Sequence, residues 1–277
     1  MNIGLRMHDS APGTLAERAQ AIRQQGFSCV HLALSKTISP QMMNPEAATP
    51  GLAAHVKKSL GDLDVAVLGC SLNLTHPDES AYRETLKKYK AHLQLARWMN
   101  AGVVGSETGN PNAGYKYDPL HSHTTEALEM FIRRVAPVVE CAENFGVTFA
   151  IEPVYDHIVY DGKAARKVLD AIQSDNLKII LDPVNLLHPD NFDRRDEVIG
   201  EAIDLIGEET MIVHMKDYVP GGEKYKPCAC GLGVMDYTAI LRFVKERKPF
   251  IQMTMEDTKP DNAEAARLHL EALAAAL

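Results

Sequence analysis

The sequence contains no apolar run long enough to cross a membrane. Its longest runs, such as residues 147–151, have the length of a strand, whereas a membrane-spanning helix needs about 20 apolar residues. The N-terminal segment, MNIGLRMHDS, has neither the apolar centre of a secretory signal nor the composition of a transit peptide. These absences predict a protein without a membrane partner.

Paired cysteines are missing as well. The five cysteines are an odd number at unrelated spacings: Cys29, Cys70, Cys141, Cys228 and Cys230. This pattern is typical of a reduced, cytoplasmic protein rather than of a disulfide framework. Cys228 and Cys230 form a CxC pair with no second pair to complete a zinc site, so no structural zinc is predicted there.

Clusters of positive charge are also absent. The chain has no Lys- or Arg-rich run and a formal net charge of −8, which argues against a nucleic-acid partner. Hydrophobic residues make up 45% and charged residues 24% of the chain, as in an ordinary globular protein. No linker, low-complexity segment or internal repeat divides the 277 residues, so the sequence predicts a single domain over residues 1–277.

Short apolar runs alternate with longer amphipathic segments along the whole chain. We predict strands at residues 3–6, 29–34, 65–72, 102–106, 147–152, 178–182, 211–216 and 250–256. The predicted helices cover residues 14–25, 50–60, 80–99, 124–144, 163–173, 194–206, 237–246 and 261–277. The strands are nearly continuous in apolar residues, as buried parallel strands are. Eight strands, each followed by a helix, predict an α/β protein with the (β/α)8 TIM-barrel architecture.

An open, doubly wound sheet is the main alternative architecture. It would need a glycine-rich turn after the first strand, but Met7, His8 and Asp9 follow that strand. The two longest loops, residues 110–122 and 219–233, both follow predicted strands. In a barrel they would hang over the C-terminal face, where barrel enzymes carry out their chemistry.

Ionisable residues stand at the C-terminal ends of the last four predicted strands, one per strand: Glu152, Asp182, His214 and Glu256. In a closed barrel these ends converge, and three carboxylates would repel one another unless a cation lay between them. A single such residue is explained well enough as a satisfied buried polar group, whereas four in register favour a metal site. Mixed carboxylate and imidazole ligation suits Mn²⁺, Mg²⁺, Co²⁺ or Zn²⁺. The sequence therefore predicts one divalent metal ion, with manganese as the first candidate.

Short sequence motifs carry these four residues in order along the chain: AIEPV, ILDPVN, VHMKD and TMED. Together with SETG at residues 106–109 and GLGVMD at residues 231–236, they resemble the xylose isomerase-like superfamily of sugar-phosphate isomerases and epimerases. The resemblance extends from the first strand to the last helix. It implies a single metal ion bound by Glu152, Asp182, His214 and Glu256. It also implies that Glu152 and Glu256 flank the substrate and exchange protons with it.

The function implied by the resemblance is metal-dependent isomerisation or epimerisation of a sugar or sugar phosphate. A metal chelated by a carbonyl and the adjacent hydroxyl acidifies the neighbouring C–H, because it stabilises the resulting enediolate. One carboxylate then removes the proton, and another, or the same one, returns it. Barrels of this family often form dimers or tetramers, so a homo-oligomer is a further expectation.

Five further residues near the strand ends are candidates for substrate binding: His157, Asn185, Lys216, Glu107 and Asn73. The alternative for each is a solvated loop residue or a hydrogen-bond partner of a metal ligand. Sugar epimerases of the family often place a histidine at the position of Asn185 and a second glutamate at that of Ile158, so the metal ligands match better than the substrate contacts. We interpret His8 and His31 as satisfied buried histidines, and Asp236 as the start of the seventh helix.

Three other functions stay open at this point. A metal-dependent dehydratase of a keto-inositol-type substrate would use the same carbanion chemistry but expel a β-hydroxyl. A phosphodiesterase of the apurinic-endonuclease kind would need a histidine-rich zinc cluster and a basic DNA-binding face, whereas here only His214 stands squarely at a strand end and the net charge is negative. A non-catalytic barrel that binds a small metabolite would be marked by lost metal ligands, and all four candidates are present.

Overall fold

Eight parallel strands close into a barrel in the computed structural model, which describes residues 1–222 and 225–277. The order around the barrel is β1-β10-β7-β6-β5-β4-β3-β2. The barrel strands are β1 (Asn2–Arg6), β2 (Cys29–Leu32), β3 (Asp64–Gly69), β4 (Val103–Glu107), β5 (Phe149–Glu152), β6 (Leu177–Leu181), β7 (Thr210–Met215) and β10 (Gln252–Met255). The predicted (β/α)8 TIM barrel is confirmed.

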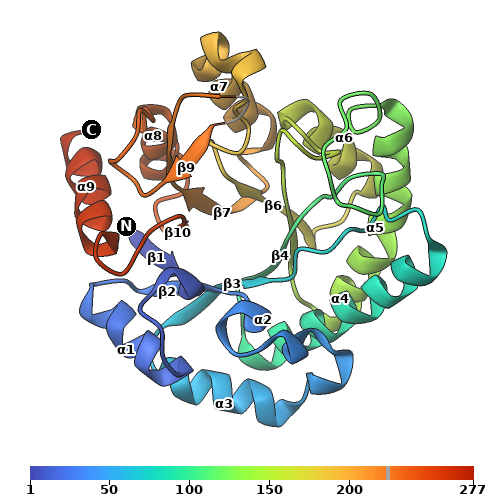
Figure 1. Ribbon diagram of the computed structural model, residues 1–277, viewed down its shortest axis with the longest axis horizontal. Helices are drawn as coiled ribbons and strands as arrows, with labels where there is room; N and C mark the ends of the chain where they lie inside the picture. The colour runs from blue at the N-terminus through green and yellow to red at the C-terminus, as the bar shows by residue number, and fades with distance from the viewer. Residues whose placement is uncertain (223–224) are drawn as a thin grey trace.

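Helices surround the barrel as an outer ring (Figure 1). They are α1 (Leu15–Gln24), α2 (Leu34–Thr37), α3 (Pro50–Leu60), α4 (Glu79–Met99), α5 (Thr125–Phe145), α6 (Gly162–Ile172), α7 (Arg195–Ile206), α8 (Thr238–Arg247) and α9 (Ala263–Ala276), with 3-10 turns η1 (Met7–Asp9), η2 (Pro40–Met43), η3 (Pro45–Ala47) and η4 (Pro189–Arg194). The local sequence determines where several helices begin and end. Thr14 and Glu17 form a reciprocal capping box at the start of α1. Gly146 ends α5 with a φ of 62°, a left-handed conformation that glycine adopts without steric cost.

A separate buried cluster fills the space enclosed by strands β2 to β7. Its members are Cys29, Ala66, Val67, Val103, Ala150, Ile180 and Ile212. The barrel is therefore packed with side chains rather than hollow, as TIM barrels are. Parallel pairing then holds the strand ends in register, so that Glu107 on β4 lies opposite Glu152 on β5.

Several strand boundaries differ from the prediction by a few residues. Strand β6 ends at Leu181 and β10 at Met255, so Asp182 and Glu256 lie one residue beyond their strands. Phe250, predicted to begin the last strand, is 86% exposed. Pairing between β10 and β1 begins only at Gln252, and the apolar character of Phe250 does not reveal that it precedes the paired segment.

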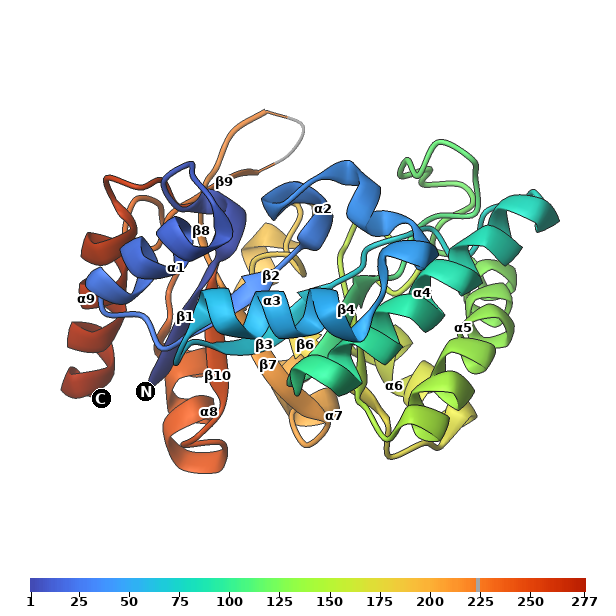
Figure 2. The same ribbon diagram turned by 90° about the horizontal axis from the view of Figure 1, so that it is seen from below.

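Two elements at the C-terminal face were not predicted. One is the short helix α2, and the other is an antiparallel hairpin of β8 (Asp217–Val219) and β9 (Lys226–Cys228). The hairpin takes up part of the predicted loop 219–233, of which residues 223 and 224 lie outside the described residues. Figure 2 shows the hairpin, α2 and the loop before α5 projecting from the same side of the barrel. These segments follow strand ends, and they build the walls around the barrel mouth.

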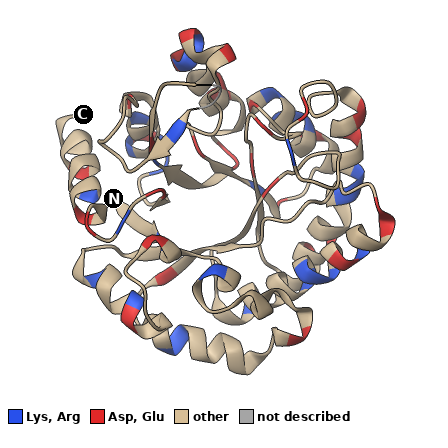
Figure 3. Cartoon of the chain, in the orientation of Figure 1, with Lys and Arg blue, Asp and Glu red and all other residues tan. Residues whose placement is uncertain are grey.

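The outer surface carries both signs of charge. In the view of Figure 3, Lys and Arg segments are interspersed with Asp and Glu segments over the ring of helices. Among the described residues, no helix combines the length and the apolar character that a membrane span requires.

Candidate metal centre and active site

The four predicted metal ligands converge at the C-terminal mouth of the barrel, and each is at least nine-tenths buried: Glu152 after β5, Asp182 after β6, His214 on β7 and Glu256 after β10. The ligand atoms of Glu152, Asp182 and His214 all lie within 4.8 Å of one another. Those of His31, His214 and Glu256 form a second group within the same limit. His214 belongs to both groups, so it marks the centre of the cluster.

The imidazole of His214 lies between two carboxylates and is 1% exposed. Its Nδ1 is 3.3 Å from Glu152 Oε2 and 3.5 Å from Glu256 Oε1. Burial by itself would lower the pKa of His214, but the charges of Glu256 and Glu152 raise it to about 9. Neither ring nitrogen makes a well-directed hydrogen bond to a residue that the structure describes. Buried polar atoms are normally satisfied, and a metal ion bound to a deprotonated ring nitrogen would supply the partner that this ring lacks.

Asp182 is held by the backbone that follows it. Its Oδ1 accepts hydrogen bonds from the N–H groups of Val184 and Asn185, at 2.9 and 3.1 Å. Its Oδ2 lies 2.9 Å from Lys216 Nζ. Burial raises the pKa of Asp182 to about 6, although the nearby Lys216 opposes this shift. The turn after β6 therefore aims one oxygen of Asp182 into the centre.

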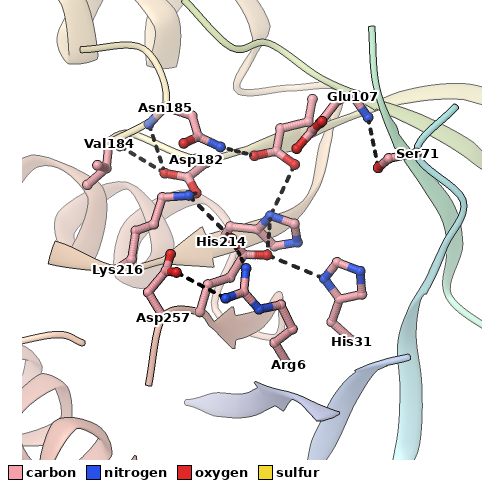
Figure 4. Close-up of polar contacts among 12 residues, drawn as sticks. Arg6, His31, Ser71, Glu107, Asp182, Val184, Asn185, His214, Lys216 and Asp257 are labelled. Carbon is pink, nitrogen blue, oxygen red and sulfur yellow. Dashed lines mark hydrogen bonds and ion pairs between the residues drawn. The ribbon is translucent and has the colours of Figure 1, made fainter. Parts of the chain in front are cut away.

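Two cations, Lys216 and Arg6, hold Glu256 in place. Figure 4 shows Lys216 beside Asp182, and Arg6 beside Asp257. Glu256 Oε2 lies 3.3 Å from Lys216 Nζ and 3.2 Å from Arg6 Nη1. Arg6, which ends β1, also forms ion pairs with Asp9 at 2.9 Å and Asp257 at 3.1 Å. Burial alone would raise the pKa of Glu256, but His214 and Lys216 keep it well below its usual range. Glu256 is therefore an ionised carboxylate, as a metal ligand or a general base must be.

Glu152 has a neutral partner instead. The side-chain amide of Asn185 donates a hydrogen bond to Glu152 Oε1, which leaves Oε2 facing His214. Burial again opposes ionisation of Glu152, but His214 lowers its pKa below the usual value. Asn185 and Lys216 were both predicted as substrate-binding residues. The structure places each in direct contact with a candidate metal ligand.

His31 and Arg6 are the residues that the sequence analysis missed. The His31 ring stacks on His214 with the centroids 5.2 Å apart, and its Nδ1 is 3.5 Å from Glu256 Oε1. This Nδ1 makes no hydrogen bond within the described residues, so the expectation of a satisfied histidine is wrong for His31. His8 Nδ1 is likewise without a hydrogen bond there. The sequence carries a signal for both missed residues. Arg6 is a charged residue at the end of β1, and His31 is an imidazole in β2.

Glu107 and His157 lie next to each other on the β4 and β5 side of the mouth. Tyr115 Oη donates to Glu107 Oε2 at 3.1 Å, and His157 Nε2 is 4.0 Å from the same oxygen. Burial, together with the charges of Glu152 and Glu256, raises the pKa of Glu107 to about 7. This carboxyl therefore exchanges a proton close to neutral pH.

Asn73 connects two loops. Its Nδ2 donates to the carbonyl oxygens of Asn110 and Asn112, at 2.9 and 2.8 Å, and its Oδ1 accepts from Thr75. The structure thus places Asn185 and Lys216 against candidate ligands. Glu107 lies opposite Glu152 with His157 beside it, whereas Asn73 joins the loops after β3 and β4.

A cavity of about 380 Å³ opens beside the cluster. It is lined by Arg6, His8, His31, Ser35, Lys36, Ser71, Glu107, Tyr115, Glu152 and Glu256, together with a few apolar residues. Its size is in the range of small-molecule sites, and most of its walls are hydrogen-bonding groups. The cavity can therefore hold a small polyhydroxylated molecule in contact with two ionised carboxylates.

The donor set fits a divalent cation. Three carboxylates and an imidazole provide the oxygen and nitrogen ligands that Mn²⁺, Mg²⁺, Co²⁺ and Zn²⁺ use. The ring nitrogens of His214, which make no hydrogen bond in the described part of the chain, are the observation that favours a ligand role over a purely structural one.

One family model matches almost the whole chain. The family model described as xylose isomerase-like TIM barrel matches residues 19–276. No curated protein matches the sequence.

Solved structures resemble the chain over nearly its whole length. The 3-keto-D-glucoside 4-epimerase YcjR from E. coli has a TM-score of 0.76 at 13% identity, covering 98% of this chain and 99% of its own. The probable 3-DHS dehydratase AsbF from Bacillus anthracis has a TM-score of 0.73 at 12% identity, covering 99% and 98%. The IOLI protein, solved with a bound zinc atom, has a TM-score of 0.71 at 15% identity, covering 98% and 96%. At such identities the likeness concerns the fold.

Proposed function

This chain belongs to the xylose isomerase-like TIM barrel family, and from this premise we propose that it is a metal-dependent isomerase or epimerase of a sugar or sugar phosphate. One observation carries the proposal. The carboxylates of Glu152 and Glu256 lie 3.3 and 3.5 Å from the same nitrogen of His214, and both line the polar cavity of about 380 Å³. The epimerase named among the similar folds supports this reaction class.

The proposed ligands are Glu152, Asp182, His214 and Glu256, and manganese is the ion to test first. A divalent ion held by these residues would supply a Lewis acid for the carbonyl and adjacent hydroxyl of the substrate, making the neighbouring C–H more acidic. The zinc-bound structure named among the similar folds supports a metal in this kind of barrel.

The side chains divide the proton transfer between two faces of the cavity. Glu152 comes from β5 and Glu256 follows β10, so the two carboxylates approach a substrate from different walls. One removes the proton beside the carbonyl, and the other delivers a proton to the opposite face or to the neighbouring carbon. Return to the opposite face gives an epimer, whereas return to the neighbouring carbon exchanges aldose and ketose.

Neighbouring residues keep the two carboxylates in different environments. Lys216 and Arg6 hold Glu256 ionised, while Asn185 fixes Glu152 with a neutral amide. Because no cation other than His214 contacts Glu152 among the described ion pairs, its basicity is reduced less. We therefore assign the first proton removal to Glu152 and the return to Glu256.

A dehydratase is the second candidate, and Glu107 is the observation that favours it. With a pKa of about 7, this cavity-lining carboxyl holds a proton that it can donate to a departing β-hydroxyl. The dehydratase named among the similar folds supports the same possibility.

Metal analysis combined with solvent-deuterium exchange tests the proposal. The purified protein is expected to contain about one metal ion per chain, and to incorporate deuterium beside the carbonyl of at least one member of a panel of ketoses, inososes and their phosphates. Loss of water from that substrate would select the dehydratase. A metal-loaded protein that neither exchanges nor dehydrates any member of the panel would contradict both candidates.

A further inference from the structure

A second cavity, of about 190 Å³, lies on the β5–β7 side of the metal ligands. Its walls come from the segments after β5 and β6 and from hairpin β8–β9: Val154, Tyr155, Asp156, Val184, Asn185, Leu187, His188, Lys216, Tyr225 and Pro227. All these segments follow strand ends, so the second cavity opens at the same mouth as the larger one.

Direct contacts link the linings of the two cavities. Glu152 and Glu256 line the larger cavity, and their direct partners line the smaller one. Asn185 donates to Glu152, and Lys216 Nζ is 3.3 Å from Glu256 Oε2. A molecule whose reacting carbons contact the two glutamates would reach the smaller cavity by passing Asn185 and Lys216.

Flat rings and aliphatic side chains form most of the smaller cavity. The rings of Tyr155 and His188 stack with their centroids 4.3 Å apart and 5° between planes. Tyr155 is fixed further by its N–H, which donates to the carbonyl of Asn185 at 2.7 Å, and by its hydroxyl, which donates to Asp190 at 3.2 Å. The pair forms a rigid wall of the cavity, so a ligand that packs against it does not pay the entropy cost of ordering these side chains.

The charges of the smaller cavity are already matched by protein partners. Lys216 lies 2.9 Å from Asp182 Oδ2 as well as near Glu256, and His188 Nδ1 accepts a hydrogen bond from the N–H of Asp190 at 3.3 Å. Asp156 adds a negative charge to the lining. Among the residues that the structure describes, an anionic group such as a phosphate would therefore meet no unpaired positive charge in this cavity, which favours an uncharged ligand.

We propose that the smaller cavity binds an uncharged, ring-shaped substituent of the sugar substrate, either a second sugar ring or an aryl group. The reacting carbons of the same molecule lie in the larger, more polar cavity. This inference rests on the proposed function, because it assigns two parts of one substrate to the two cavities. It predicts a substrate larger than a free monosaccharide.

Direct binding to the manganese-loaded protein tests the assignment. The probes are the methyl and phenyl β-glycosides of 3-keto-glucose and 3-keto-galactose, which keep a carbonyl beside a hydroxyl, together with the reducing disaccharides cellobiose and lactose. The Kd values come from titration calorimetry. At least one phenyl glycoside or disaccharide is expected to bind about tenfold tighter than its methyl counterpart, which corresponds to about 1.4 kcal/mol. A preference confined to the phenyl members would identify an aryl substituent, and one confined to the disaccharides a second sugar.

Variants test whether the preference for ring-bearing probes arises in the smaller cavity. Tyr155→Ala should remove most of it, whereas Tyr155→Phe should keep it, because the ring rather than the hydroxyl makes the contact. Val154→Phe should also remove it by filling the cavity. Tyr82→Ala, a truncation of equal size on the outer helix α4, is the control and should leave the preference unchanged.

Three results would overturn the inference: equal Kd values for methyl and ring-bearing probes, a preference that survives both Tyr155→Ala and Val154→Phe, or no binding by any probe. Failure of the proposed function is recognised separately. A ring preference in a protein that exchanges no deuterium would contradict the reaction alone, whereas exchange without a ring preference would contradict this inference alone.

Discussion

His214 is the side chain shared by both groups of candidate metal ligands. One group contains Glu152 and Asp182, and the other contains His31 and Glu256. The two imidazoles stack with their ring centroids 5.2 Å apart, so at the scale of single residues either ring could supply the nitrogen ligand. His214 is the favoured ligand, because its Nδ1 lies between the carboxylates of Glu152 and Glu256.

Substitution of the two histidines separates these alternatives. His214→Ala should lower the metal content of the purified protein several-fold, because a ligand is lost, and His31→Ala should leave it near one ion per chain. Elemental analysis after dialysis gives the comparison, with circular dichroism to confirm that both variants fold. Metal loss in His31→Ala but not in His214→Ala would transfer the ligand role to His31.

The two glutamates are tested by removing charge and retaining shape. Glu152→Gln and Glu256→Gln should each reduce deuterium exchange and turnover by about 10²–10⁴-fold, the usual contribution of a positioned acid or base. Asp64→Asn, at the start of β3 and away from the mouth, is the control and should retain activity. Wild-type turnover in either glutamine variant would remove that residue from the mechanism.

At the scale of elements, the segment after β7 is anchored by one buried carboxylate. Asp217 Oδ1 accepts hydrogen bonds from the N–H groups of Tyr218 and Met235, both at 2.8 Å, and Oδ2 accepts from Gly231 at 3.0 Å. These bonds fold GLGVMD back against the hairpin. The motif read as structural in the sequence thus shapes the wall beside Lys216, and Asp236 stands two residues before α8, with its Oδ1 accepting from the Thr238 N–H.

Asp217→Asn should weaken this anchor. We expect a loss of about 1–3 kcal/mol in the free energy of unfolding, because the amide cannot satisfy all three buried N–H groups. Denaturant titration measures the loss, and faster hydrogen exchange at residues 229–235 should locate it. Asp236→Asn is the matched control with a near-zero effect, since Asn caps a helix start as well as Asp does. Equal losses in both variants would contradict the anchoring role.

At the scale of the whole molecule, the metal-free barrel carries an excess of protons at its mouth. The pKa of Asp182 is raised from 3.8 to about 6 and that of His214 from 6.5 to about 9. Histidines with lowered pKa values, such as His8 and His31, oppose this excess only below about pH 6.5. Between about pH 6.5 and pH 9 the folded state keeps the proton of His214 that the unfolded chain has lost. The contribution of His214 to stability therefore falls as pH rises through this range.

Metal loading should remove this pH dependence, because the ion replaces the protons on its ligands. Manganese at 100 times its Kd should stabilise the protein by about 2.7 kcal/mol, and the gain in Tm over an EDTA-treated sample should be larger at pH 9 than at pH 6. Thermal unfolding with and without EDTA provides the measurement. A gain that is the same at both pH values would show that these groups are not displaced by the ion.

The fold and the four candidate metal ligands were accessible to sequence reasoning. The alternation of apolar runs and amphipathic segments is local, and eight repeats of it are enough to predict the barrel. Strand ends in a barrel converge, so Glu152 and His214 were predictable from position alone. The ends of β6 and β10 were each placed a residue too late, because pairing rather than apolar character ends a strand.

The sequence by itself therefore determined the barrel and the carboxylate-rich mouth, since both follow from patterns along the chain. Only the tertiary structure decided that Arg6 and His31 contact Glu256, which lies more than 200 positions away in the sequence. Closure of the barrel brings β1 next to β10, and the register of that closure sets which side chains meet. The second cavity likewise depends on how loops from three strands pack against one another, which no periodicity along the chain encodes.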